Sequence, residues 1–340
     1  MKKILTQVET NIPPDFDPKV YLSLHEDVKN AGVDPTTHYL TYGRNEGRKY
    51  KVEKPKTFEE SLADFLTVPP SDQNAFDLFP TAWSSAFEGV QTSGTFKGYD
   101  DARLKWLLHR LDLSNKTVLE LGPLEAAHTF MLEKAGADVL AVESNKGAFL
   151  RCLITKNYLN LSAKFLLGDF EKMDLTDRHF DLVLASGVLY HMKDPVKLLE
   201  SISKASDRLF IWTHYFEPDL SKWNPVLAPL LNDRKWHHHE PVVTHYDGLT
   251  IRLVKQNYGE ALGWSGFCGG SDVFSNWIYR EDLLALLRKL GFKTIEISFD
   301  DIQHQNGPAF CLLCEKIAPL ATCPPIRHIW GHEPAARHCS

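Results

Sequence analysis

The chain has 340 residues, of which 43% are hydrophobic and 24% are charged, values that exclude a disordered, collagen-like or low-complexity protein. Its 44 acidic and 38 basic residues leave a net charge of -6 at pH 7, which gives no support for general electrostatic capture of nucleic acid. The length predicts about two structural units. No apolar stretch reaches the roughly 18 residues of a membrane helix. Six cysteines are too few for a disulfide scaffold, so we expect a cytoplasmic protein with reduced thiols.

Residues 1–50 are predicted to form a small helical appendage. Asp17 and Pro18 predict a helix start, with Asp17 as the cap and Pro18 at the first helical position. A second short helix is predicted from Asp34-Pro35 to Gly43. The region resembles a helical unit of bacterial glycosyltransferases and other enzymes of surface-glycan assembly, through the segments Phe16-Asp17-Pro18, His38-Tyr39-Leu40 and Gly43-Arg44-Asn45-Glu46-Gly47-Arg48. We expect it to have no catalytic role.

Short β-rich runs alternate with helical stretches in the middle of the chain. The runs are Thr117–Leu121, Asp138–Glu143, Ala163–Leu167, Phe180–Ala185 and Arg208–Thr213. This alternation predicts a parallel sheet with helices on both faces. Two further runs, 292–299 and 308–315, are joined by a polar loop without a helix, which predicts an antiparallel final pair. The expected fold class is α/β, with a Rossmann-like, mostly parallel sheet of seven strands whose last strand is antiparallel.

Polar residues follow four of the predicted strands at their carboxyl ends, where open parallel sheets bind ligands. After the first strand, Gly122 lets the backbone turn tightly and approach a ligand. Glu143 ends the second strand and can accept both hydroxyl hydrogens of a ribose. Asp169 and Phe170 follow the third strand and offer a carboxylate and an aromatic face suited to an adenine. The fourth strand ends at Ser186-Gly187.

These strand ends, in this order, resemble those of class I S-adenosylmethionine-dependent methyltransferases. The resemblance covers roughly residues 100–317 and implies S-adenosylmethionine as the cofactor. It implies that Glu120 and Gly122 contact the amino-acid end of the cofactor, and that Ser186 and Gly187 lie beneath the methyl donor. The implied cofactor-binding residues are Glu120, Gly122, Pro123, Glu143, Ser144, Asn145, Asp169, Phe170, Ser186 and Gly187.

The first loop departs from the family's usual glycine spacing. Leu124 and either Ala126 or Ala127 stand where the second and third glycines are expected. Two further segments, 187–195 and 276–283, partly resemble the branch whose members modify the wobble uridine of transfer RNA by carboxymethyl transfer. The chain has no strongly basic run that favours a transfer RNA, so this acceptor is an alternative only.

Methyl transfer to a hydroxyl needs close positioning of the reactants and a group that takes the hydroxyl proton. His191, after the fourth strand, is the first candidate base, and His214, after the fifth strand, is the second. Tyr190 is a candidate for orienting the acceptor. Each of these residues has an ordinary alternative, which is local packing or hydrogen bonding.

Residues 214–276 form an insertion long enough to be a substrate lid. Its histidines 237–239 are neighbours in sequence and point in different directions, so we predict no metal site. Tryptophans 223, 236 and 264 fit either a pocket wall or ordinary packing of the lid. Cys311 and Cys314 fall on opposite faces of the last predicted strand, which indicates buried thiols rather than a zinc or redox pair.

The sequence therefore predicts a helical appendage (1–50), a linker with a cofactor-covering cap (51–116), a methyltransferase domain (117–317) and an irregular tail (318–340). The expected function is O-methylation of a sugar or another small-molecule hydroxyl. Two alternatives stay open, a transferase that modifies transfer RNA with methyl or carboxymethyl groups, and a noncatalytic cofactor-binding scaffold in glycan assembly. The sequence specifies neither the acceptor nor the oligomeric state.

Overall fold

The computed structural model describes residues 12–52, 64–218, 241–263 and 269–316. The chain divides into two units, Met1–Pro69 and Pro70–Ser340. Within the described ranges, no helix is long and apolar enough to cross a membrane. The predicted tail, histidines 237–239 and tryptophans 223, 236 and 264 lie outside the described residues.

The first unit is a set of short helices around a small aromatic core. They are α1 (Pro18–Leu24), α2 (Glu26–Asn30), α3 (Pro35–His38) and the π-helical turn η1 (Tyr39–Gly43). The carboxylate of Asp17 accepts hydrogen bonds from the first backbone N–H groups of α1, and that of Asp34 does the same for α3. Both predicted helix starts are therefore confirmed. Tyr21, Val28 and Tyr39 are buried between the helices.

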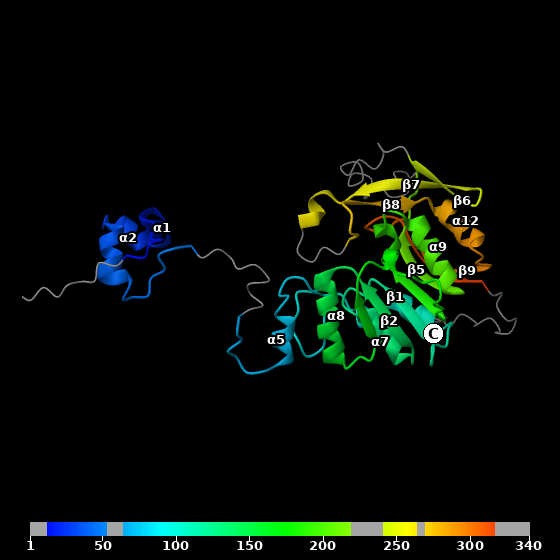
Figure 1. Ribbon diagram of the computed structural model, residues 1–340, viewed down its shortest axis with the longest axis horizontal. Coiled ribbons are helices and arrows are strands. Elements are labelled where there is room, and N and C mark those ends of the chain that lie inside the picture. The colour runs from blue at the N-terminus through cyan, green and yellow to red at the C-terminus, as the bar shows by residue number, and fades with distance from the viewer. Residues whose placement is uncertain (1–11, 53–63, 219–240, 264–268, 317–340) are drawn as a thin grey trace, which may run out of the picture. The chain divides into compact units, whose positions relative to one another are not determined.

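The second unit is built on a seven-stranded sheet in the order β3-β2-β1-β4-β5-β10-β9 (Figure 1). Its strands are β1 (Thr117–Leu121), β2 (Asp138–Glu143), β3 (Lys164–Leu167), β4 (Leu182–Ser186), β5 (Arg208–His214), β9 (Thr294–Asp301) and β10 (Ala309–Glu315). The pairs from β3 to β5 are parallel, and β10 is antiparallel to both β5 and β9. The mostly parallel sheet with an antiparallel last strand is confirmed.

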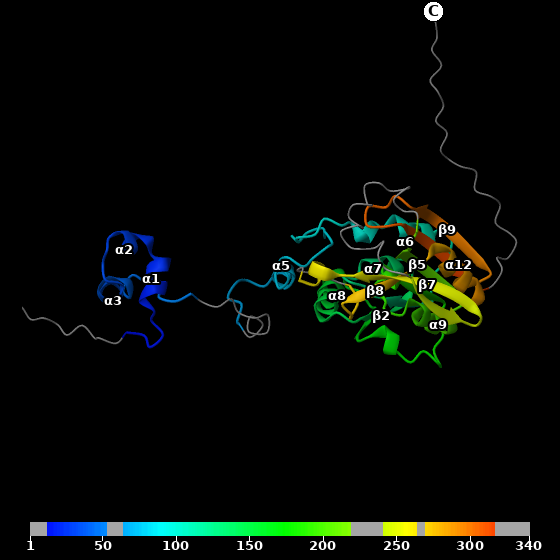
Figure 2. The same cartoon turned by 90° about the horizontal axis from the view of Figure 1, so that it is seen from above.

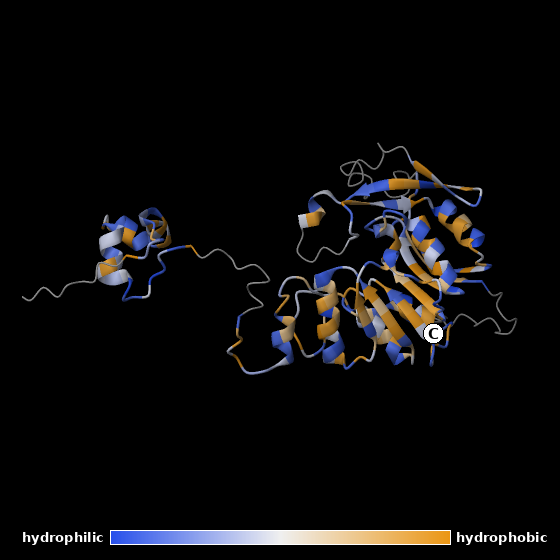
Figure 3. Ribbon diagram, in the orientation of Figure 1, coloured by the Kyte–Doolittle hydropathy of each residue, from blue (hydrophilic) through white to orange (hydrophobic). Residues whose placement is uncertain are grey.

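Helices cover both faces of this sheet because its strands alternate apolar side chains between the faces. Val118 packs with helices α6 (Ala102–Leu108) and α7 (Ala127–Lys134), whereas its neighbour Leu119 belongs to the core that includes α9 (Pro195–Ala205) and α12 (Arg280–Lys289). Figure 3 shows the apolar stretches along the strands. The remaining helices are α8 (Lys146–Leu159), α5 (Asp72–Phe76) and the short turns η2 (Gly98–Asp100), η3 (Phe170–Lys172), η4 (Leu189–His191) and η6 (Gly259–Gly263).

The cysteines of β10 follow the same alternation. Cys311 lies in the core under α6 and α7, and Cys314 lies in the opposite core. Both are fully buried free thiols, and burial raises the pKa of Cys311 to about 12. The prediction of buried, unpaired thiols on opposite faces is confirmed.

A second sheet of three antiparallel strands lies in the insertion after β5, where the sequence analysis predicts no strands (Figure 2). Its strands are β6 (Val242–Tyr246), β7 (Leu249–Asn257) and β8 (Phe274–Ile278). Asp247 and Gly248 connect β6 to β7 with φ angles of 43° and 79°, as a two-residue hairpin requires. The backbone N–H of Asn276 in β8 donates to the carbonyl of Met192, directly after η4. The second sheet is therefore joined to the carboxyl end of the first.

Candidate functional site

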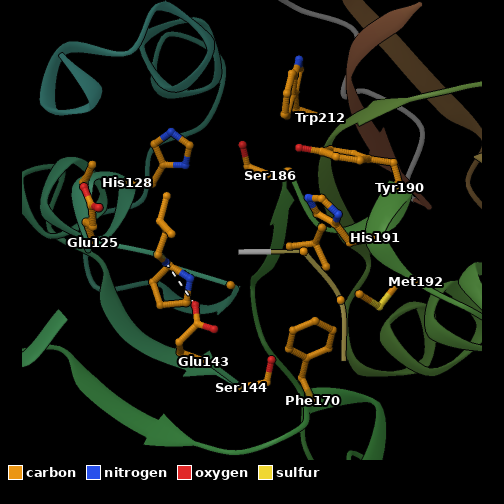
Figure 4. Close-up of a pocket in the computed structure, with 18 of the residues that line it drawn as sticks. Glu125, His128, Glu143, Ser144, Phe170, Ser186, Tyr190, His191, Met192 and Trp212 are labelled. Atoms are coloured by element: carbon orange, nitrogen blue, oxygen red, sulfur yellow. Dashed lines mark hydrogen bonds between the residues drawn. The ribbon is translucent and has the colours of Figure 1, made fainter. Parts of the chain in front are cut away.

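A cavity of about 220 Å³ opens at the carboxyl ends of the parallel strands (Figure 4). The structure brings ten of the predicted site residues to its wall: Gly122, Pro123, Glu143, Ser144, Asp169, Phe170, Ser186, Gly187, Tyr190 and His191. The other three, Glu120, Asn145 and His214, do not line it. In Figure 4, Glu143, Ser144 and Phe170 lie at one end of the cavity, and Trp212 lies at the other.

The loop after β1 contains only one glycine, yet three of its residues have the positive φ angles that glycine usually adopts. Gly122, Leu124 and Ala126 have φ angles of 63°, 54° and 60°. These three positions are spaced as in a Gly-x-Gly-x-Gly sequence. A left-handed conformation costs a non-glycine residue roughly 1–2 kcal/mol. Leu124 and Ala126 therefore hold left-handed backbone conformations that a glycine adopts without this cost.

Glu143 at the end of β2 is the residue that holds this loop. Its carboxylate accepts hydrogen bonds from the N–H of Leu124 at 3.3 Å and from the N–H of Asn145 at 2.8 Å. Burial raises the pKa of Glu143. Asn145 itself faces away from the cavity, because its side chain caps α8 by accepting from the N–H of Ala148.

Glu120 lies within the core of the domain. It is 1% exposed, and its carboxyl accepts a hydrogen bond from the Thr129 hydroxyl of α7. Burial raises the pKa of Glu120 to about 7. The expected contact between Glu120 and the amino-acid end of a cofactor is not visible in this arrangement.

Asp169 and Phe170 lie side by side where β3 leads into η3. The Asp169 carboxylate accepts a hydrogen bond from the N–H of Glu171 and forms an ion pair with Lys172 at 2.9 Å. Phe170 is 7% exposed and presents its ring to the cavity (Figure 4). This end of the cavity is therefore apolar on one side and acidic on the other.

His191 and Tyr190 lie on η4 at the carboxyl end of β4. Burial lowers the pKa of His191 to about 4, so its imidazole is neutral at pH 7 and carries a lone pair. The ring of Tyr190 packs edge-on against Trp212 and His214, with ring centroids 5.7 and 4.6 Å apart. Tyr190 is therefore held in an aromatic cluster, and the neutral His191 has a lone pair that can accept a proton.

His214 is buried behind Tyr190 at the end of β5. Its Nδ1 lies 2.9 Å from the carbonyl oxygen of Gly307, which can only accept, so Nδ1 carries the proton. Its ring stacks on Trp277 with centroids 4.9 Å apart. Burial lowers its pKa to about 4. This packing supports Tyr190 and does not bring His214 to the cavity.

A cap segment, residues 84–96, contributes residues to the cavity that the sequence did not indicate. The buried Glu125 carboxylate accepts from the backbone N–H groups of Ser84 and Ser85, both at 2.8 Å. Ser85 and Phe96 line the cavity, and Phe96 is 47% exposed. Glu125 therefore fixes the cap segment to the loop after β1.

The ion pair of Asp101 and Arg103 lies near Trp212 in the cavity wall. Asp101 accepts hydrogen bonds from Arg103, and its carboxylate lies 2.9 Å from Nε2 of His128. The Arg103 guanidinium packs over the Trp212 ring, 4.5 Å from its centroid. Arg103 belongs to the segment predicted as the cofactor-covering cap (51–116), but no local pattern indicated Trp212.

The cavity fits an S-adenosylmethionine-type cofactor in two respects. Its wall contains the Ser186 hydroxyl, a buried polar atom with no hydrogen-bond partner among the described residues. At Gly122, an added Cβ would approach Val188 to 3.1 Å, so a small residue keeps the loop close to the cavity. Within the described part of the chain, no group of three or more His, Cys, Asp or Glu side chains is arranged to hold a metal.

Comparison with known proteins agrees with this site. Residues 119–206 match the family model described as a methyltransferase domain. The crystal structure of the N-terminal domain of EvdMO1 in the presence of SAH and D-fucose superposes with a TM-score of 0.54 and 23% sequence identity, over 72% of this chain and 94% of that chain. This likeness shows the shared fold.

Two curated relatives are tRNA U34 carboxymethyltransferases. The enzyme of Campylobacter fetus is 26% identical over 113 residues, which are 32% of this chain and 40% of the relative. That of Campylobacter hominis is 22% identical over 222 residues, 64% of this chain and 67% of the relative. The chain thus aligns with less than half of the length of the first relative.

The family match defines a methyltransferase domain at residues 119–206, and the sheet that contains these residues has the fold of the SAH-bound EvdMO1 domain. The resemblance to class I methyltransferases is confirmed.

Proposed function

We propose that this protein transfers the methyl group of S-adenosylmethionine to a hydroxyl of a sugar or another small molecule. The observation that carries the proposal is a half-buried histidine at the cavity wall, which is neutral at pH 7. His191 lies directly after β4, beside Ser186 and Gly187, where the resemblance implies that the methyl donor lies. A neutral imidazole there can accept the proton that a hydroxyl must lose when it is methylated.

Within this proposal, the chain's own residues bind, orient and accept a proton. Glu143 accepts the ribose hydroxyls, and Phe170 packs against the adenine. Ser186 offers its unpartnered hydroxyl beneath the reacting centre. Bound S-adenosylmethionine supplies an activated methyl group. Tyr190 lines the acceptor side, and His191 takes the hydroxyl proton.

Two observations support a sugar acceptor. The EvdMO1 domain that shares this fold was crystallised in the presence of D-fucose as well as SAH. In addition, the N-terminal helical unit resembles those of enzymes of surface-glycan assembly. In the same proposal, the second sheet, β6 to β8, serves as the acceptor-side lid expected for residues 214–276.

The test is transfer of a labelled methyl group from S-adenosylmethionine to a panel of free sugars, sugar phosphates and nucleotide sugars. We expect at least one sugar class to be labelled. His191→Gln should remove most of the labelling while S-adenosylhomocysteine (SAH) binding persists. A protein that binds the cofactor but labels no sugar would contradict the proposed acceptor class.

The second candidate function is modification of transfer RNA, which the two curated relatives favour. The net charge of -6 disfavours it, because nucleic-acid affinity relies on cationic contacts to phosphates. A gel-shift titration with bulk transfer RNA at low salt distinguishes the two. Saturable binding together with labelling of the RNA from S-adenosylmethionine would establish the second function in place of the first.

A further inference from the structure

Tyr258, the residue after β7, connects the second sheet to His191. Its hydroxyl lies 2.9 Å from Nδ1 of His191 and 3.4 Å from the carbonyl oxygen of the same residue. The backbone N–H of Gly270 donates to the same hydroxyl at 3.2 Å. Three polar groups therefore converge on one phenolic oxygen, immediately behind a histidine that lines the cavity.

Gly270 lies so close to His191 that only a glycine fits. A Cβ at position 270 would lie 2.3 Å from the His191 carbonyl oxygen. Gly269, Gly270 and Ser271 all line the cavity. The hydroxyl of Tyr258 thus joins the acceptor-side segment 269–271 to the candidate base.

The chemistry of these groups limits the directions that the hydrogen bonds can take. A phenolic hydroxyl donates one proton and can accept two hydrogen bonds. A carbonyl oxygen only accepts, and a backbone N–H only donates. The Tyr258 hydroxyl occupies Nδ1 of His191, which leaves Nε2 as the ring nitrogen that can take a proton from an acceptor. For Nε2 to have the lone pair, Nδ1 must carry the ring proton and donate it to the Tyr258 hydroxyl, while that hydroxyl donates to the His191 carbonyl oxygen.

We propose that Tyr258 is the positioning residue that holds His191 as the Nδ1–H tautomer, with the Nε2 lone pair available to the acceptor hydroxyl. This inference rests on the proposed function and deepens it, because it states which nitrogen acts. The step is balanced. The acceptor O–H bond breaks and its proton moves to Nε2, the oxygen bonds to the methyl carbon, and the electron pair of the broken C–S bond stays on sulfur.

The hydrogen bond from the Gly270 N–H to the Tyr258 hydroxyl would also link acceptor binding to catalysis. An acceptor that moves segment 269–271 also moves the Gly270 N–H, which is one of the donors to the Tyr258 hydroxyl. The orientation of His191 therefore depends on a correctly placed acceptor-side segment.

The experiment is nitrogen-15 NMR of the full chain with labelled histidine, at pH 7 and in the presence of SAH. The His191 signals are assigned by their absence in His191→Gln. We expect the wild-type His191 to show a protonated Nδ1 and an unprotonated Nε2. In Tyr258→Phe, we expect loss of this preference, with protonated Nε2 appearing for the same residue.

Tyr246→Phe is the matched control, because Tyr246 belongs to the same three-stranded sheet and has no contact with His191 among the described interactions. It should leave the His191 signals unchanged. Gly270→Ala should shift the tautomer in the same direction as Tyr258→Phe, since its methyl group forces the segment away from His191.

A wild-type His191 protonated on Nε2, or a tautomer that is the same in Tyr258→Phe, would overturn the inference. A calorimetric titration with SAH separates this outcome from failure of the proposed function. If SAH binds normally while the tautomer is unaffected, only the role of Tyr258 is wrong. If SAH does not bind, the proposed function fails.

Discussion

Burial of Glu120 has a calculable consequence for stability. In the unfolded chain its carboxyl titrates near 4.5, whereas burial raises the pKa to about 7 in the fold. The folded state therefore binds this proton more tightly than the unfolded state does. The stabilisation is fully present below pH 4.5 and is lost progressively as the pH rises through 7. Since one pKa unit corresponds to about 1.4 kcal/mol, the full difference is about 3 kcal/mol.

Glu120→Gln is the corresponding perturbation. The amide keeps the shape of the side chain and can accept the hydrogen bond from Thr129, but it does not ionise. We expect the free energy of unfolding of the wild type to fall by about 2–3 kcal/mol more than that of the variant between pH 5 and pH 8. Urea unfolding at each pH, followed by circular dichroism, measures this difference. Parallel pH profiles for the two proteins would refute the reasoning.

Four further variants test the loop after β1 and its contacts, one of them as a helical control. Glu143→Gln should weaken SAH binding by about 10- to 100-fold in calorimetry, because a charged hydrogen-bond acceptor is lost; an unchanged affinity would remove Glu143 from the cofactor site. Glu125→Gln should lower the free energy of unfolding by about 1–3 kcal/mol, because one of the two N–H groups of the cap segment loses its acceptor. Ala126→Gly should change stability by less than about 0.5 kcal/mol, since φ is positive there, whereas Ala285→Gly in the middle of α12 should cost about 1 kcal/mol. Equal losses for the last two would contradict the left-handed loop.

Much of the fold could be predicted because the parallel strands are short apolar runs separated by helices. The predicted runs at Thr117–Leu121 and Asp138–Glu143 coincide with β1 and β2. The second sheet was not predicted, although a signal exists. Asp247-Gly248 is a strong hairpin signal, and at the start of β7 exposed Thr250 and Arg252 alternate with buried Ile251 and Leu253.

The lining of the cavity could be predicted where residues end a parallel strand, as Glu143 and Ser186 do. Contacts that join distant segments could not. Glu125 bonds to backbone N–H groups about 40 positions earlier in the chain, and backbone donors leave no trace in the sequence. The contact between the side chains of Tyr258 and His191 joins residues 67 positions apart, and no local pattern in the sequence pairs them. Glu120 was expected at the cofactor, but strand alternation turns it toward Thr129 instead.

Calorimetric titration of the full chain with SAH tests the central claim, that the cavity binds the methyl-donor cofactor, most directly. Methyl transfer to any acceptor requires this binding. The account predicts saturable binding of one SAH per chain. No binding at cofactor concentrations up to about 1 mM, where an affinity of about -4 kcal/mol is already detectable, would contradict it.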